Sequence, residues 1–245
     1  MHVIGVRDDL NEFRHIHPVA SSTPGLFSLE TFFTAPGVYK FWSQIKTDGV
    51  IHTFGHPMLR VGGFGATSTK QIDFGRQVTV GDYQVALDDH HLAAAGPTSE
   101  LSFNIETVTG DPVAVENYLG APMHLAVISE DLKHFSHTHP SGESHGHSWL
   151  WPSVFANGGE HMFEPINFEV VFPAAGRYKL FAQFRPRGIG LPEEEALTAT
   201  FWVEVAETGP AANYATTLGW WPKLLISAVF IVLLGSLTRR LLRVV

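Results

Sequence analysis

The chain has 245 residues and a formal net charge of −8 at pH 7, with 16% charged and 12% aromatic residues. That length allows two domains, each able to bury a core, and the acidic balance argues against binding to nucleic acid. The chain has no cysteine, which excludes disulfides, thiolate metal sites, cysteine nucleophiles and a blue-copper centre.

An internal repeat organises the chain. Residues 1–18 (MHVIGVRDDLNEFRHIHP) reappear 122 positions later as residues 123–140 (MHLAVISEDLKHFSHTHP), with 8 of 18 positions identical. A second matched block pairs residues 27–49 with residues 166–188. The sequence therefore predicts two copies of one module. Copy two has about 45 strand-like residues before its Met-His, which copy one lacks, so we expect the natural chain to start upstream of Met1.

The elements predicted along the chain are short strands. Apolar runs open both copies, and the turn residues Ala35–Gly37 and Ala174–Gly176 each predict a hairpin between the strands that flank them. Further strands are expected at 83–87, 101–108 and 197–205. Many short strands without helical periodicity indicate a mainly β protein with two immunoglobulin-like antiparallel β-sandwich repeats.

The predicted boundaries follow composition. Copy one covers residues 1–62, a Gly/Ser/Thr-rich linker follows, and copy two covers residues 71–207 with an insertion rich in His and aromatic residues. The remaining segments are the linker 63–70, the insertion 141–165, a stalk 208–217, a transmembrane helix 218–237 and a basic tail 238–245.

The segment 218–237 predicts one C-terminal transmembrane α-helix. Its 20 residues carry one charge and match the bilayer core of about 30 Å, while Trp220 and Trp221 suit the membrane interface. A buried core helix is the alternative. Arginines in the tail place it in the cytoplasm and the body outside; a tail-anchored protein that faces the cytoplasm is the competing interpretation. The small residues Ser227, Ala228 and Gly235 would let a neighbouring helix approach.

Fourteen histidines are the candidates for chemistry. His-x-His in an extended chain places both imidazoles on one face, and His with Met but no Cys favours copper over structural zinc. Copy one offers His2, His15, His17, His52, His56 and Met58. The candidate ligands of copy two are His137, His139, His145, His147 and His161, with Met123 and Met162 as softer ligands.

A structural role is the alternative for these histidines. His15, His17, His137 and His139 would then hydrogen-bond the loop backbone at a strand end, and the His145/His147 pair would be a solvated spacer. In both copies the Asp-Leu-x-x-Phe part of the motif indicates a turn followed by a core residue.

The duplicated pattern is Met-His-Leu (Met-His-Val in copy one), then Asp-Leu-x-x-Phe-x-His-x-His-Pro, then Pro-Gly-x-Tyr (Ala-Gly-x-Tyr in copy two). It resembles bacterial secreted or membrane-anchored β-sandwich proteins. It is similar to the YtkA-like and copper-resistance sandwich domains. The resemblance implies an extracytoplasmic binding module, sometimes linked to copper handling. Together with the orientation expected from the basic tail, we expect the body on the periplasmic side of the bacterial inner membrane.

No nucleophile elbow, metalloprotease motif or phosphate-binding loop occurs, so we expect no enzyme. The first functional hypothesis is a non-catalytic accessory subunit, anchored in the lipid bilayer and docked on integral membrane proteins of a larger, possibly bioenergetic complex. The aromatic residues Trp149, Trp151 and Phe155 would suit the docking surface or else cover the sandwich edge. The alternative function is a periplasmic copper-binding or copper-delivery protein.

Overall fold

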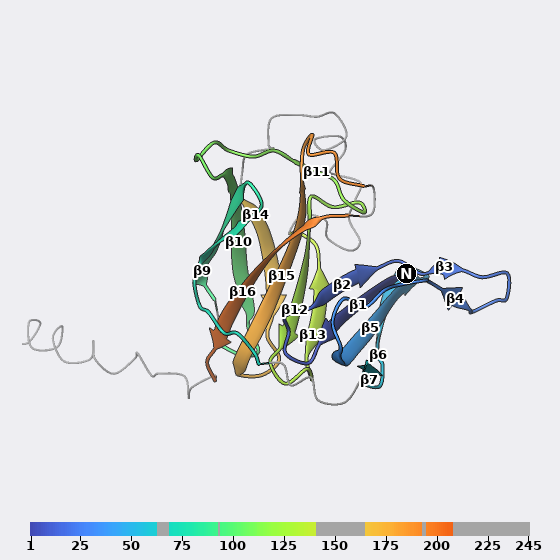
Figure 1. The fold of residues 1–245 in the computed structure, drawn as a ribbon. Coiled ribbons are helices and arrows are strands. Elements are labelled where there is room, and N and C mark those ends of the chain that lie inside the picture. Colours follow the sequence, from blue (N-terminus) through green and yellow to red (C-terminus); the bar gives the residue numbers. More distant parts are fainter. Residues whose placement is uncertain (63–68, 93, 141–164, 193–194, 208–245) are drawn as a thin grey trace, which may run out of the picture. The chain divides into compact units, whose positions relative to one another are not determined.

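The computed structural model describes residues 1–62, 69–92, 94–140, 165–192 and 195–207, which are coloured in Figure 1. Within these ranges every regular element is a β-strand and every strand pair is antiparallel. The mainly β antiparallel class is therefore confirmed, and the immunoglobulin-like assignment stays a prediction.

The predicted membrane helix 218–237 lies outside the described residues. The part of the chain that the structure describes contains no helix long and apolar enough to span a membrane. Residues 1–207 form one compact unit.

Copy one and copy two each build one sheet with the same strand order. The copy-one sheet runs β2-β1-β5-β6, with β7 also paired to β5, and the copy-two sheet runs β13-β12-β15, with β16 and β11 also paired to β15. The copy-one sheet consists of β1 (His2–Arg7), β2 (Phe13–Ile16), β5 (Gly37–Thr47), β6 (Val50–Gly55) and β7 (Leu59–Val61). The copy-two sheet consists of β11 (Val115–Glu116), β12 (Met123–Ser129), β13 (Phe135–Thr138), β15 (Gly176–Pro186) and β16 (Leu197–Val205).

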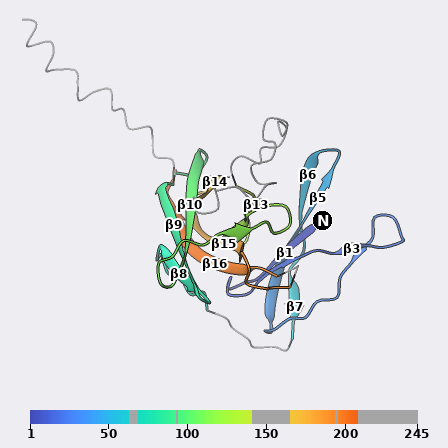
Figure 2. The ribbon, with the colours of Figure 1, turned by 90° about the horizontal axis from the view of Figure 1, so that it is seen from above.

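The strands that precede the motif of copy two form a third sheet, the outer sheet, in the order β14-β10-β9-β8. Its strands are β8 (Gln77–Val80), β9 (Tyr83–His91), β10 (Thr98–Thr107) and β14 (Ile166–Val171). Two short strands, β3 (Val19–Ala20) and β4 (Phe27–Ser28), pair with each other in a hairpin that extends away from the sheets in Figures 1 and 2.

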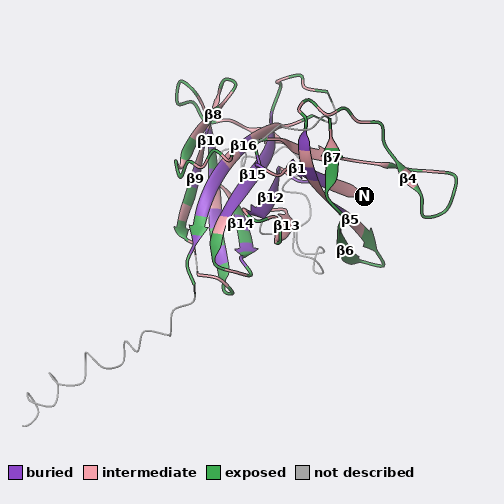
Figure 3. Cartoon of the chain, turned by 60° about the horizontal axis from the view of Figure 1, so that its bottom comes forward, coloured by how far each residue is buried: buried purple, intermediate pink, exposed green. Residues whose placement is uncertain are grey.

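The copy-two sheet lies between the other two sheets (Figures 1 and 2). All seven residues of β12 are buried because both faces of the strand are covered. Leu125 and Val127 join the larger core, which the outer sheet completes, whereas Ala126 and Ile128 join a second core shared with Ile4 and Val6 of the copy-one sheet. Figure 3 shows this burial on the central strands.

Within the described residues the first copy contributes one sheet and the small β3-β4 hairpin, where the sequence predicted a sandwich repeat that lacks its leading strands. Its partner is the copy-two sheet. Two aromatic stacks join the copies reciprocally: Phe13 stacks on Phe181 at 4.4 Å between ring centroids, and Phe135 stacks on Trp42 at 4.8 Å. Phe13 and Phe135 match in the repeat, as do Trp42 and Phe181, so the contact is self-complementary, like that of a two-fold dimer.

Both hairpin predictions are wrong. The Ala174–Gly176 turn does not close a hairpin, because β14 pairs with β10 in the outer sheet while β15 pairs with β12 and β16. Phe168 on β14 and Leu180 on β15 face the same core from opposite sheets, which explains why burial favours a crossing over a hairpin. In copy one, β4 pairs with β3 and β5 with β1, so the Ala35–Gly37 hairpin is not formed either.

The predicted role of the Asp-Leu motif after β1, a turn that places a residue in the core, is confirmed. The Asp9 carboxylate accepts hydrogen bonds from the Arg7 guanidinium and from Asn11, while Leu10 takes the left-handed backbone region at φ 61° and is fully buried. Copy two repeats the device with Leu132 at φ 62°.

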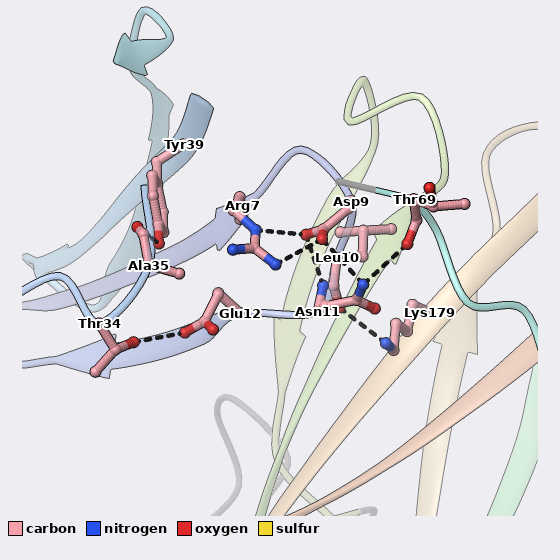
Figure 4. Close-up of polar contacts among 10 residues, drawn as sticks. All are labelled: Arg7, Asp9, Leu10, Asn11, Glu12, Thr34, Ala35, Tyr39, Thr69 and Lys179. Atoms are coloured by element: carbon pink, nitrogen blue, oxygen red, sulfur yellow. Dashed lines mark hydrogen bonds and ion pairs between the residues drawn. The ribbon is translucent and has the colours of Figure 1, made fainter. Parts of the chain in front are cut away.

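This turn docks onto copy two through a buried lysine. The Nζ atom of Lys179 donates a hydrogen bond to the Leu10 carbonyl oxygen at 2.8 Å (Figure 4). Lys179 also lies over the rings of Phe181 and Trp202, and burial lowers its pKa. A buried ammonium group needs such partners, so Lys179 fixes the position of the turn on the copy-two sheet.

Candidate metal site

Strand register gathers histidines from both copies on the faces where the two sheets meet. In copy one, His2 starts β1, His15 lies opposite Ile4 on β2, and His17 follows the strand. In copy two, His124 lies on β12, His137 lies opposite Ala126 on β13, and His139 follows. Residues two apart in a strand share a face. The three imidazoles of copy one therefore lie on the same face as Ile4, and those of copy two on the same face as Ala126, toward the second core.

We call His2, His15 and His17 the first trio and His124, His137 and His139 the second trio; together they are the cluster histidines. In the first trio, His2 Nδ1 lies 2.8 Å from His15 Nε2 and 3.2 Å from His17 Nε2. In the second trio, His124 Nδ1 lies 3.1 Å from both His137 Nε2 and His139 Nε2. The same three ring atoms thus converge in both copies.

Two glutamines hold the central rings across the copies. His15 Nδ1 donates to Gln183 Oε1 at 2.7 Å, and His137 Nδ1 donates to Gln44 Oε1 at 2.9 Å. An amide oxygen only accepts, so both rings carry their proton on Nδ1. In the neutral imidazole the lone pair is then on Nε2, the atom that points into the trio.

The ring of His124 is fixed by the backbone. Its Nε2 donates to the Tyr118 carbonyl oxygen at 2.7 Å, so the lone pair of the neutral ring is on Nδ1. His124 Nδ1 and His137 Nε2 therefore face each other at 3.1 Å as two acceptors. Two acceptors at that distance repel unless a cation lies between them.

Protonation does not supply that cation at neutral pH. Burial, followed by repulsion from neighbouring histidines, lowers the pKa of His15 to about 2 and of His124 to about 3. Burial also lowers the pKa of His2 to about 4, and that of His137 falls well below its ordinary value. These rings are neutral near pH 7, which is the state that binds a metal.

The histidines can therefore hold a metal ion. The ligand atoms of the first trio lie within 4.8 Å of one another, and so do those of a mixed set, His15, His124 and His137, that draws on both copies. Imidazole nitrogen is a ligand for copper, zinc, iron and nickel. Each central ring has the outer hydrogen bond that metal-binding histidines need.

The structure places the predicted ligands as follows. His137 and His139 are in the second trio, together with His124. Met123 is fully buried in the larger core, with Leu125 and Val127, on the face of β12 opposite His124, so it is not brought to the trio. The predicted ligands His145, His147, His161 and Met162 and the docking residues Trp149, Trp151, Phe155, Trp220, Trp221, Ser227, Ala228 and Gly235 lie outside the described residues.

The other copy-one candidates lie elsewhere. His52 and Met58 are exposed, and His56 Nε2 contacts Ser43 Oγ on β5. The predicted site residues did not include Gln44 and Gln183, the partners of the central rings, although the two glutamines match in the aligned repeats. That identity, next to the repeated histidines, was the available signal.

The fold and the site define a duplicated β protein whose two copies enclose a shared histidine cluster. Residues 1–61 and 78–207 match the family described as a domain of unknown function, DUF8832, and the chain belongs to this family. The matched ranges include all six cluster histidines. No curated protein and no solved structure matches the chain. The resemblance to YtkA-like and copper-resistance domains stays a prediction.

Proposed function

We propose that this protein binds copper between its two copies, with the cluster histidines as ligands. The observation that carries the proposal is the pair of facing acceptors, His124 Nδ1 and His137 Nε2, at 3.1 Å. Carbonyl oxygens of Tyr118 and Gln44 hold the protons of both rings on their far side. A metal ion turns this repulsion into coordination.

Copper suits the donor set better than zinc for two reasons. Among divalent ions, copper binds a given nitrogen site most tightly. The imidazoles are also neutral, so the ion brings its whole charge into a buried site. Because the cost of burying an ion rises with the square of its charge, a monovalent cuprous ion incurs about a quarter of the cost of a divalent zinc ion.

Binding or delivery, rather than catalysis, is the role we propose. The first trio and His137 and His139 are half-buried, whereas His124 is 1% exposed. The partial exposure of five of the six rings lets an ion enter and leave. We place the protein outside the cytoplasm on the strength of the predicted anchor 218–237 and the basic tail that follows it.

The test is copper uptake by the full chain purified without chelators. We expect bound copper in the unaltered protein, and His124→Ala and His137→Ala should each weaken binding at least tenfold. The exposed His52 supplies the matched control, His52→Ala, which should bind like the unaltered protein. If the unaltered protein takes up no copper from a weak competing chelator, the proposal is wrong.

We also propose docking on integral membrane proteins as a second function. The supporting observation is a group of exposed large apolar side chains on copy one, including Phe32 at 77% exposure and Val50 and Phe54 at 55% each. Exposed apolar groups of this kind mark interaction surfaces. Mild detergent extraction followed by native mass spectrometry tests it. Migration as a 27.0 kDa species without a reproducible partner contradicts this function.

A further inference from the structure

The two trios correspond residue by residue in the repeat. His2 matches His124, His15 matches His137, and His17 matches His139. The shared geometry extends to the atoms, because in each copy the Nδ1 of the first ring meets the Nε2 of the other two at 2.8–3.2 Å. Ligand nitrogens around one ion, at bonds of about 2.0–2.1 Å, lie about 3.3–3.6 Å apart. In each trio the two distances from the Nδ1 of the first ring are thus close to those within one coordination shell.

Neither trio is complete without the other copy. The glutamine that fixes His15 is Gln183 of copy two, and the glutamine that fixes His137 is Gln44 of copy one. Each glutamine nevertheless lies in register with the first ring of its own trio, Gln44 opposite His2 and Gln183 opposite His124. Each trio therefore depends on a glutamine side chain of the other copy, and the two sites form together.

The trios are also neighbours. The ring centroids of His15 and His137 are 4.9 Å apart, and His2 lies 5.3 Å from His137. The ligand nitrogen of His15 is within 4.8 Å of those of His124 and His137. Ions in the two trios would be close enough for their charges and electron spins to interact.

We propose that the cluster is a dinuclear centre that holds two copper ions per chain, one in each trio. This inference rests on the proposed copper function and adds the number of ions and their pairing. Like charges at this separation in a protein interior repel strongly, so the second ion binds about tenfold or more weakly than the first. The alternative is one ion in the mixed set His15, His124 and His137, which uses neither His17 nor His139.

Titration of the metal-depleted full chain with cuprous ion, in the presence of a chromophoric competing chelator, counts the ions. We expect two per chain, with His17→Ala and His139→Ala each leaving one and the double variant leaving none. The control His52→Ala should keep two. A single ion per unaltered chain that also survives the double variant identifies the mixed set and overturns the dinuclear centre. Absence of any copper instead overturns the proposed function itself.

Electron paramagnetic resonance of the oxidised, fully loaded protein gives a readout that needs no variant. Two neighbouring cupric ions should couple, so that the signal integrates to fewer than two spins or shows a half-field line. A signal of two isolated cupric ions per chain would overturn the pairing even where the stoichiometry is two.

Discussion

The stack of Phe13 on Phe181 is the sharpest place to test whether the two copies pack together. The rings lie 4.4 Å apart with an interplanar angle of 13°, and Phe13 packs against the core that the two copies share. We expect Phe13→Ala to lower the free energy of unfolding by about 2–3 kcal/mol. A fully buried Phe→Ala change costs about 3–5 kcal/mol, but Phe13 is only half-buried.

About 1 kcal/mol of this loss belongs to the ring pair itself. A double-mutant cycle of Phe13→Ala with Phe181→Leu isolates that coupling. The assay is urea unfolding of the metal-free full chain, followed by circular dichroism with a chelator present. Phe32 is 77% exposed, so the control Phe32→Ala should cost less than about 0.5 kcal/mol. If Phe13→Ala costs no more than this control, the copies do not pack as described.

Three further predictions concern the cluster histidines, their glutamine partners and Gly5. The metal-free protein should lose stability as the pH falls below 6.5, because burial holds the pKa values of three cluster histidines at about 4 or lower. The native rings then stay neutral while the unfolded chain takes up protons, so the free energy of unfolding falls by about 2 kcal/mol per histidine by about pH 5. A urea unfolding midpoint that does not change between pH 7 and pH 5 contradicts this prediction. Gln44→Leu and Gln183→Leu should each weaken copper binding about 10–100-fold, measured by chelator competition. The control Gln77→Leu, at an exposed position of β8, should leave the affinity unchanged. Equal copper affinities in all three variants would show that the two glutamines do not support the site. Gly5→Val should destabilise the fold in thermal unfolding, because a Cβ atom there would meet the Phe41 ring at 2.2 Å; an unchanged midpoint would place Phe41 elsewhere.

The strands and the duplication could be predicted from the sequence because they are local patterns. Alternation defines the strand 197–205, which the structure forms with those bounds, and the Asp-Leu turn follows from side-chain chemistry within four residues. The sharing of the copy-two sheet is not local. In the sequence, the burial of both faces of β12 is visible only as a nearly uniform apolar run. Such a run indicates a strand covered on both faces but does not say which sheets cover it.

For the same reason, the sequence predicts some of the candidate ligands but not how they are arranged. His-x-His spacing identified His137 and His139 as candidate ligands, but the spacing does not say which rings meet. Met123 adjoins His124 in sequence and yet faces the opposite core, since neighbouring residues in a strand point to opposite faces. The exchange of Gln44 and Gln183 between copies depends on how two sheets stack, which no single-strand pattern encodes.

Anomalous diffraction from copper-soaked crystals of the full chain, recorded on both sides of the copper absorption edge, would locate copper at the cluster histidines. We expect two anomalous peaks between the copies, one bonded to His2 Nδ1 and one to His124 Nδ1, each about 2.0–2.1 Å from its imidazole nitrogens. Crystals that take up copper elsewhere on the surface, with no peak at either nitrogen, would contradict it.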